Sequence, residues 1–209
     1  MLEFYATKLS TVEINYTFYR MPNPTIIAGW SATVPDGFTF VLKAPQRITH
    51  IARLRDIDDP LRYFCETARG LGPKLGPLLF QLPPNFKQDT TRLANLLSQL
   101  PPGLRCACEF RHDSWFAEDT YALLRQYNAA LCVADTDEKT TPIVTTADFG
   151  YMRLRDEGYN ADDLANWATR VRDLGQQWQD GYIFFKHEES GAGPRLAQEF
   201  LALMTPSAS

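Results

Sequence analysis

The sequence has few of the features that mark a membrane, secreted or nucleic-acid-binding protein. No apolar run is long enough to span a bilayer, and residues 1–5 lack the charged-then-apolar layout of a signal peptide. The net charge is −4, which argues against a broad surface for nucleic acid and leaves only a local basic patch for binding phosphate. We therefore expect a cytoplasmic protein with no membrane partner.

Cysteine and histidine are also scarce, and neither has the spacing of a metal motif. The four cysteines are expected to be buried thiols, because Cys106 and Cys108 lie two residues apart on an apolar strand. The three histidines could join the carboxylates of Glu13, Glu109 and Asp135 in a metal site, but ordinary hydrogen bonding is the favoured interpretation. These histidines are His50, His112 and His187. We expect no metal and no cofactor.

What the sequence does contain is seven apolar runs that end in polar residues. Side chains alternate across a strand, so alternate positions share one face. The predicted polar faces are Thr11/Glu13/Asn15, Thr39/Val41/Lys43, Leu79/Gln81, Ala107/Glu109/Arg111, Leu131/Val133/Asp135, Tyr151/Arg153/Arg155 and Tyr182/Phe184/Lys186. The opposite faces are apolar throughout. Helical patterns lie at residues 2–9, 60–71, 89–99, 117–128, 161–178 and 194–204.

This alternation predicts an α/β fold, a TIM-barrel-like parallel (β/α) barrel. We expect it to form one domain over residues 1–209, with a site at the carboxyl ends of its strands. A complete barrel has eight strands, and the seven runs here follow a predicted helix. We therefore expect a barrel without its first strand, because either the native chain starts after that strand or its start was assigned late. The alternative is that an eighth strand lies near residues 143–145.

Four motifs, in order, resemble the YecE-like family, also known as domain of unknown function 72. They are TVEINYTFY at 11–19, FVLKAP leading to ITH at 40–50, LGPLLFQLPP at 75–84 and EFRHDSW at 109–115. The later segments YMRLR at 151–155 and FFKHE at 184–188 look like further parts of that family. The resemblance implies a TIM-barrel-like fold and supplies no reaction. It also implies that a Gly-Trp-containing first strand is missing from this chain.

The densest chemistry lies at residues 109–115. Glu109 is expected to point into the barrel top as an acid or base, with Arg111 above it and His112 in the loop that follows. Asp135 is the third predicted catalytic residue. A purely structural Glu–Arg network, a helix cap at residues 113–114 and a packing role for Trp115 are the alternatives.

Cationic side chains gather at the predicted strand ends. Because they converge in an acidic protein, we expect a small anionic partner that carries a phosphate or carboxylate. The alternative is salt bridging to the nearby carboxylates. The predicted substrate-binding residues are Glu13, Asn15, Lys43, Gln81, Arg111, Trp115, Arg153 and Lys186.

The leading functional hypothesis is a metal-independent acid–base enzyme, of hydrolase or lyase type, that acts on a small polar anion at the barrel mouth. A nucleic-acid-binding or nucleic-acid-processing protein is the second hypothesis, and steep loss of affinity with added salt would favour it. A non-catalytic ligand-binding protein is the third. The sequence does not indicate the oligomeric state.

Overall fold

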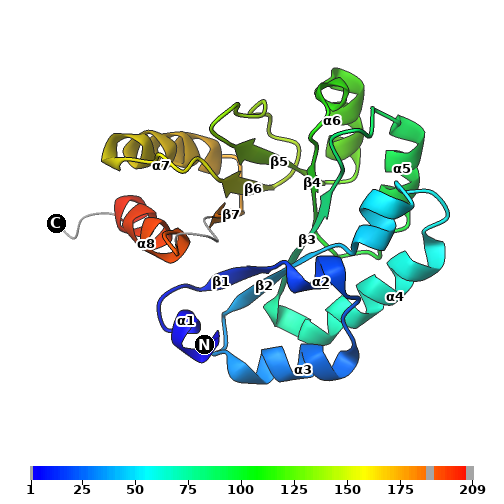
Figure 1. Ribbon diagram of the computed structural model, residues 1–209, viewed down its shortest axis with the longest axis horizontal. Helices are drawn as coiled ribbons and strands as arrows, with labels where there is room; N and C mark the ends of the chain where they lie inside the picture. Colours follow the sequence, from blue (N-terminus) through cyan, green and yellow to red (C-terminus); the bar gives the residue numbers. More distant parts are fainter. Residues whose placement is uncertain (1, 187–190, 206–209) are drawn as a thin grey trace. The chain divides into compact units, whose positions relative to one another are not determined.

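The computed structural model describes residues 2–186 and 191–205. A helix or short helical segment follows every strand except the one at Ala130–Asp135, and every strand pairing described within a unit is parallel (Figure 1). The predicted fold class, α/β and TIM-barrel-like, is confirmed. The chain divides into two compact units, Met1–Ala129 and Ala130–Ser209, which are described separately.

The first unit contains four parallel strands whose order follows the sequence. They are β1 (Thr11–Ile14), β2 (Thr39–Lys43), β3 (Leu75–Gln81) and β4 (Cys106–Glu109). The register places Lys43 beside Leu79 and Gln81 beside Glu109. Partners in register share a face, so the predicted polar face of these four strands is confirmed.

The helices of this unit pack on the apolar face of the sheet or follow the ends of its strands. They are α1 (Leu2–Ala6), α2 (Tyr16–Tyr19), α3 (Pro24–Thr33), α4 (Asp58–Ala68), α5 (Thr90–Ser98) and α6 (Glu118–Gln126), with the short helical segments η1 (Arg47–Ile51), η2 (Arg69–Lys74) and η3 (Asp113–Trp115). Phe64 of α4 contacts Phe80 of β3 edge to face, and Trp30 of α3 stacks on Phe40 of β2. The sequence pattern did not predict α3, although Asn23 caps its first turn by accepting from the Ile26 amide.

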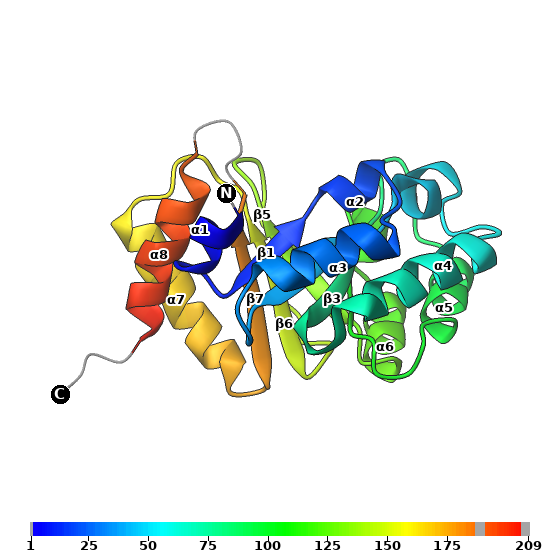
Figure 2. The ribbon, with the colours of Figure 1, turned by 90° about the horizontal axis from the view of Figure 1, so that it is seen from below.

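The second unit contains three parallel strands and two long helices. These are β5 (Ala130–Asp135), β6 (Phe149–Leu154), α7 (Ala161–Gly175), β7 (Asp180–Phe185) and α8 (Gly193–Met204). Figure 2 shows α7 and α8 together beside β7. Their apolar stripes bury Met152, Leu154, Leu164 and Phe200 in one core cluster. A capping box of Asn160 and Asp163 begins α7.

The predicted polar face of β5 is wrong. The register pairs Val133 with Met152 and Asp135 with Leu154, so Asp135 lies on the face that packs against α7. Cys132 and Ala134 lie on the face of Arg153 instead. The strand is apolar on both faces up to Asp135, and alternation cannot orient such a strand, because a shift by one residue exchanges the two faces.

The described residues contain seven strands and no strand at residues 143–145. That segment instead runs along β5 through side-chain hydrogen bonds, because the Leu131 amide donates to Thr146 Oγ1 and the Ala134 amide donates to Thr141 Oγ1, each within 2.9 Å. No helix in the described ranges is both long and apolar enough to cross a membrane. All four cysteines are buried and free, as the sequence predicted.

Candidate functional site

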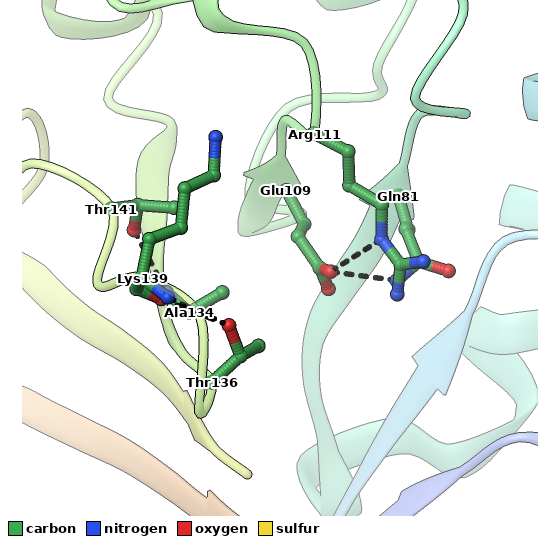
Figure 3. Close-up of polar contacts among 7 residues, drawn as sticks. All are labelled: Gln81, Glu109, Arg111, Ala134, Thr136, Lys139 and Thr141. Atoms are coloured by element: carbon green, nitrogen blue, oxygen red, sulfur yellow. Dashed lines mark hydrogen bonds and ion pairs between the residues drawn. The ribbon is translucent and has the colours of Figure 1, made fainter. Parts of the chain in front are cut away.

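Glu109 forms the centre of a polar cluster at the carboxyl ends of β3 and β4. Its side chain is almost fully buried, and Oε1 accepts from Gln81 Nε2 at 2.7 Å and from Arg111 Nε at 3.2 Å (Figure 3). The strand register brings Gln81 and Glu109 side by side, and Arg111 follows two residues later on the same face. The structure therefore confirms that these three predicted residues lie together. Arg111 is more exposed than its partner, with 39% of its side chain accessible.

Lys43 adds a second cation at the end of β2. Its side chain is buried, and Nζ lies 4.0 Å from the centre of the Phe18 ring, within the range of a cation–π contact. The buried Thr17 side chain fixes α2 against this strand, since its Oγ1 donates to the Lys43 carbonyl at 2.6 Å. The sequence pattern predicted neither this role of Thr17 nor a cation–π role for Phe18.

His50 belongs to this cluster, whereas its sequence position had favoured ordinary hydrogen bonding, with metal ligation as the alternative. Its ring contacts Phe18 edge to face at 4.8 Å, and Nδ1 lies 2.9 Å from Thr49 Oγ1. The pKa of His50 is lowered by burial first, and then by the charges of Lys43 and Arg111, which outweigh the opposing effect of Glu109. The imidazole is therefore neutral at pH 7. Its place near a strand end was the only sequence signal for this role.

A pH titration of stability tests this environment. Because the folded pKa of His50 lies below its ordinary value of 6.5, the unfolded chain binds more protons near pH 6, and the free energy of unfolding falls as pH drops through that value. We expect the stability difference between the wild type and His50→Gln to shrink from pH 7.5 to pH 5.5 in urea titrations. A difference that grows as the pH falls would contradict the lowered pKa.

The rest of the 109–115 segment builds local structure. His112 precedes η3, and its Nδ1 accepts from the Ser114 amide at 3.2 Å. Trp115 is fully buried, stacks on Phe110 at 4.6 Å and donates from Nε1 to the Phe86 carbonyl at 2.7 Å. These contacts account for both residues as capping and packing groups, the alternative that the sequence had left open. Their predicted catalytic and substrate-binding roles gain no support.

Asp135, a predicted catalytic residue, lies in a different environment from the one expected. Its carboxylate accepts from the hydroxyls of Thr140 and Tyr159 and from Trp167 Nε1 at 3.3 Å. Burial and the bond to Asp135 raise the pKa of Tyr159, so this hydroxyl remains a donor. The loop after β5 closes over the same strand end, where the Ala134 amide bonds Thr141 and Thr136 bonds Lys139 (Figure 3). Asp135 thus joins β5 to α7.

The remaining predicted residues lie in both units. Glu13 of β1 is half-buried beside Val41, and Asn15 ends that strand with a buried Oδ1 that has no hydrogen-bond partner among the described residues. In the second unit, Arg153 is fully buried on the face of Phe184, and the Lys186 amide donates to the Leu154 carbonyl. The joint contribution of Arg153 and Lys186 to one anion site with Lys43 stays a prediction.

The expectation of no metal also stays a prediction. Within residues 2–186 and 191–205, no three histidine, cysteine or acidic side chains are grouped as ligands. His187, one of the candidate ligands, lies outside the described residues. In the first unit, Lys43 and Arg111 surround His50 with positive charge, which disfavours a divalent cation at this histidine.

A family model described as "Protein of unknown function DUF72" matches residues 1–209. The UPF0759 protein YecE of Escherichia coli K12 is 35% identical over 118 residues, which cover 56% of this chain and 43% of that protein. The UPF0759 protein YunF of Bacillus subtilis is 24% identical, with 97% of this chain and 86% of that one covered. The chain matches less than half the length of the E. coli relative.

Two solved structures show the same fold. A DUF72 family protein from Enterococcus faecalis superposes with a TM-score of 0.84 at 20% identity, covering 99% of this chain and 94% of that one. A DUF72 family protein from Thermotoga maritima gives a TM-score of 0.78 at 24% identity, with 94% and 85% covered. At these identities the likeness concerns the fold alone.

Proposed function

The chain belongs to the DUF72 family, and we propose that the cluster at the ends of β2, β3 and β4 binds a small anionic molecule and transfers a proton to or from it. The proposed proton transfer makes the protein an acid–base enzyme. The residues of the cluster are Lys43, His50, Gln81, Glu109 and Arg111.

The electrostatic environment of His50 carries the proposal. Burial lowers the pKa of this imidazole most, and the charges of Lys43 and Arg111 lower it further against the opposing charge of Glu109. Lys43 is buried, so its charge is screened less by water than that of a surface lysine. Arg111 uses Nε for Glu109 and has further N–H groups that can hold the oxygens of a phosphate or carboxylate. The positive charge of buried Lys43, together with the accessible guanidinium of Arg111, favours the binding of an anion.

The same geometry supports a division of roles between His50 and Glu109. The Thr49 hydroxyl donates to the Pro45 carbonyl at 3.5 Å, so its oxygen accepts from His50. Nδ1 of His50 then carries the proton and donates to Thr49 Oγ1, and Nε2 carries the lone pair of a base. Glu109 uses its carboxylate to hold Gln81 and Arg111, which suits a positioning residue. Proton transfer is therefore assigned to His50, and orientation of the anion-binding guanidinium to Glu109.

Thermal-shift titration with sodium phosphate tests the anion site. At ten times its Kd, a ligand stabilises the folded protein by about 1.4 kcal/mol, which corresponds to a rise in Tm of about 3–6 °C for a chain of this size. We expect this rise in the wild type and most of it to be lost in Arg111→Gln. Sodium chloride at matched ionic strength controls for general salt effects.

Arg62→Gln is the matched control variant, because Arg62 is an exposed arginine of α4 that pairs only with Asp59 among the described residues. It should keep the full phosphate-dependent rise. Equal rises in the wild type and Arg111→Gln would overturn the proposed site.

A further inference from the structure

Two aromatic side chains of α2 adjoin the anion-binding cluster. Phe18 contacts three neighbours, since Tyr19 lies edge to face at 5.0 Å, His50 lies edge to face at 4.8 Å, and Lys43 Nζ lies over the ring at 4.0 Å. Tyr19 is 74% exposed, more than any other large hydrophobic or aromatic side chain described. A contiguous set of side chains thus leads from a cationic site to an open aromatic ring.

This arrangement is held in place by buried contacts. Thr17, which precedes Phe18, is fully buried, and its hydroxyl oxygen lies within 3.0 Å of the carbonyl oxygens of Ile14 and Lys43. The α2 turn is therefore tied both to its own strand and to the end of β2. An exposed tyrosine on a tethered turn loses little conformational entropy when a ligand packs on it, because the backbone is already ordered.

We propose that the anionic ligand carries a planar aromatic ring, which stacks on Tyr19 while the anionic group reaches Arg111 and His50. This inference rests on the proposed function and names the class of its ligand, an aromatic or heteroaromatic phosphate or carboxylate. Lys43 already occupies a position over the Phe18 ring, so Tyr19 is the ring left to receive the ligand. Stacked aromatic pairs gain energy beyond that of buried area, which favours a ring over an aliphatic group.

Isothermal titration with three probes tests the inference: phenyl phosphate, cyclohexyl phosphate and methyl phosphate. All three carry the same anionic group, so they differ only in what meets Tyr19. We expect the wild type to bind phenyl phosphate about tenfold more tightly than methyl phosphate, in line with the contribution of one stacked ring, and cyclohexyl phosphate to bind more weakly than phenyl phosphate. Tyr19→Ala should remove the preference for phenyl phosphate, and Tyr19→Phe should retain it.

Tyr63→Ala is the matched control, since Tyr63 is an exposed tyrosine of α4 and should leave all three affinities unchanged. Equal affinities for phenyl and methyl phosphate would overturn the aromatic inference while leaving the anion site intact. The aromatic inference would also fail if Tyr19→Ala kept the preference, or if cyclohexyl phosphate bound as tightly as phenyl phosphate. Failure of all three probes to bind would instead overturn the proposed function itself.

Discussion

Replacing Asp135 by alanine is expected to lower the free energy of unfolding by about 3–5 kcal/mol, the largest effect predicted for this chain. The carboxylate is 8% exposed and accepts hydrogen bonds from Thr140, Tyr159 and Trp167. Its removal leaves Trp167 Nε1 without its acceptor in a buried setting and the Tyr159 hydroxyl without its acceptor in a half-buried one, and each buried unsatisfied group costs about 1–3 kcal/mol. Urea unfolding followed by circular dichroism measures the change.

Asp173→Ala provides the control on the same helix that Asp135 anchors. Asp173 is an exposed residue of α7, and its replacement should change stability by less than about 0.5 kcal/mol. Tyr159→Phe removes one of the three donors and should cost about 1 kcal/mol in the wild type but much less in the Asp135→Ala background. Additive effects of these two substitutions would show that the carboxylate and the phenol do not act together.

The second large effect is expected for Glu109→Gln, which should weaken the fold and strengthen anion binding at once. The substitution keeps the shape of a side chain that is 1% exposed but removes the charge that holds Arg111. We expect a loss of about 2 kcal/mol in the free energy of unfolding, because a neutral amide oxygen is a weaker acceptor than the carboxylate Oε1 to which Gln81 and Arg111 both donate. Phosphate should bind about tenfold more tightly, since two cations lose the carboxylate that offsets them.

The opposite directions of these two changes separate the site from a structural ion-pair network. If Glu109 and Arg111 form only a structural ion pair, Glu109→Gln should lower the free energy of unfolding and leave the phosphate affinity at its wild-type value. Glu118→Gln is the control, because Glu118 and Arg125 form an ion pair that is mostly exposed and should contribute little to either measurement. Weaker phosphate binding in Glu109→Gln than in the wild type would contradict the electrostatic argument for His50.

Much of the site could be predicted where one strand face is apolar and the other is not. In β2, β3 and β4 the alternation placed Lys43, Gln81 and Glu109 on one face, and the register confirms it. The pattern needs no tertiary information, because the pleat itself sends alternate side chains to opposite faces. The family motifs likewise predicted the fold class, which the strand order and the solved relatives confirm.

Other parts of the site depended on contacts between distant segments. His50 follows β2, and its charged neighbours lie on β2 and beyond β4, so no spacing within one segment could reveal its lowered pKa. The π-helical turn that carries it has no simple sequence signature. Thr17 and Phe18 belong to a four-residue helix too short for hydrophobic periodicity to detect.

The sequence by itself determined the order of the seven strands and of six helices, the parallel fold class and the orientation of every strand whose two faces differ in polarity. Only the tertiary structure decided the orientation of β5, where Asp135 faces α7 and its buried carboxylate accepts from Tyr159 and Trp167 on that side. It also decided that Trp115 is a packing residue, since Phe86 and Phe110 enclose it. Burial and hydrogen bonding are relations between segments distant in sequence, and local patterns do not encode them.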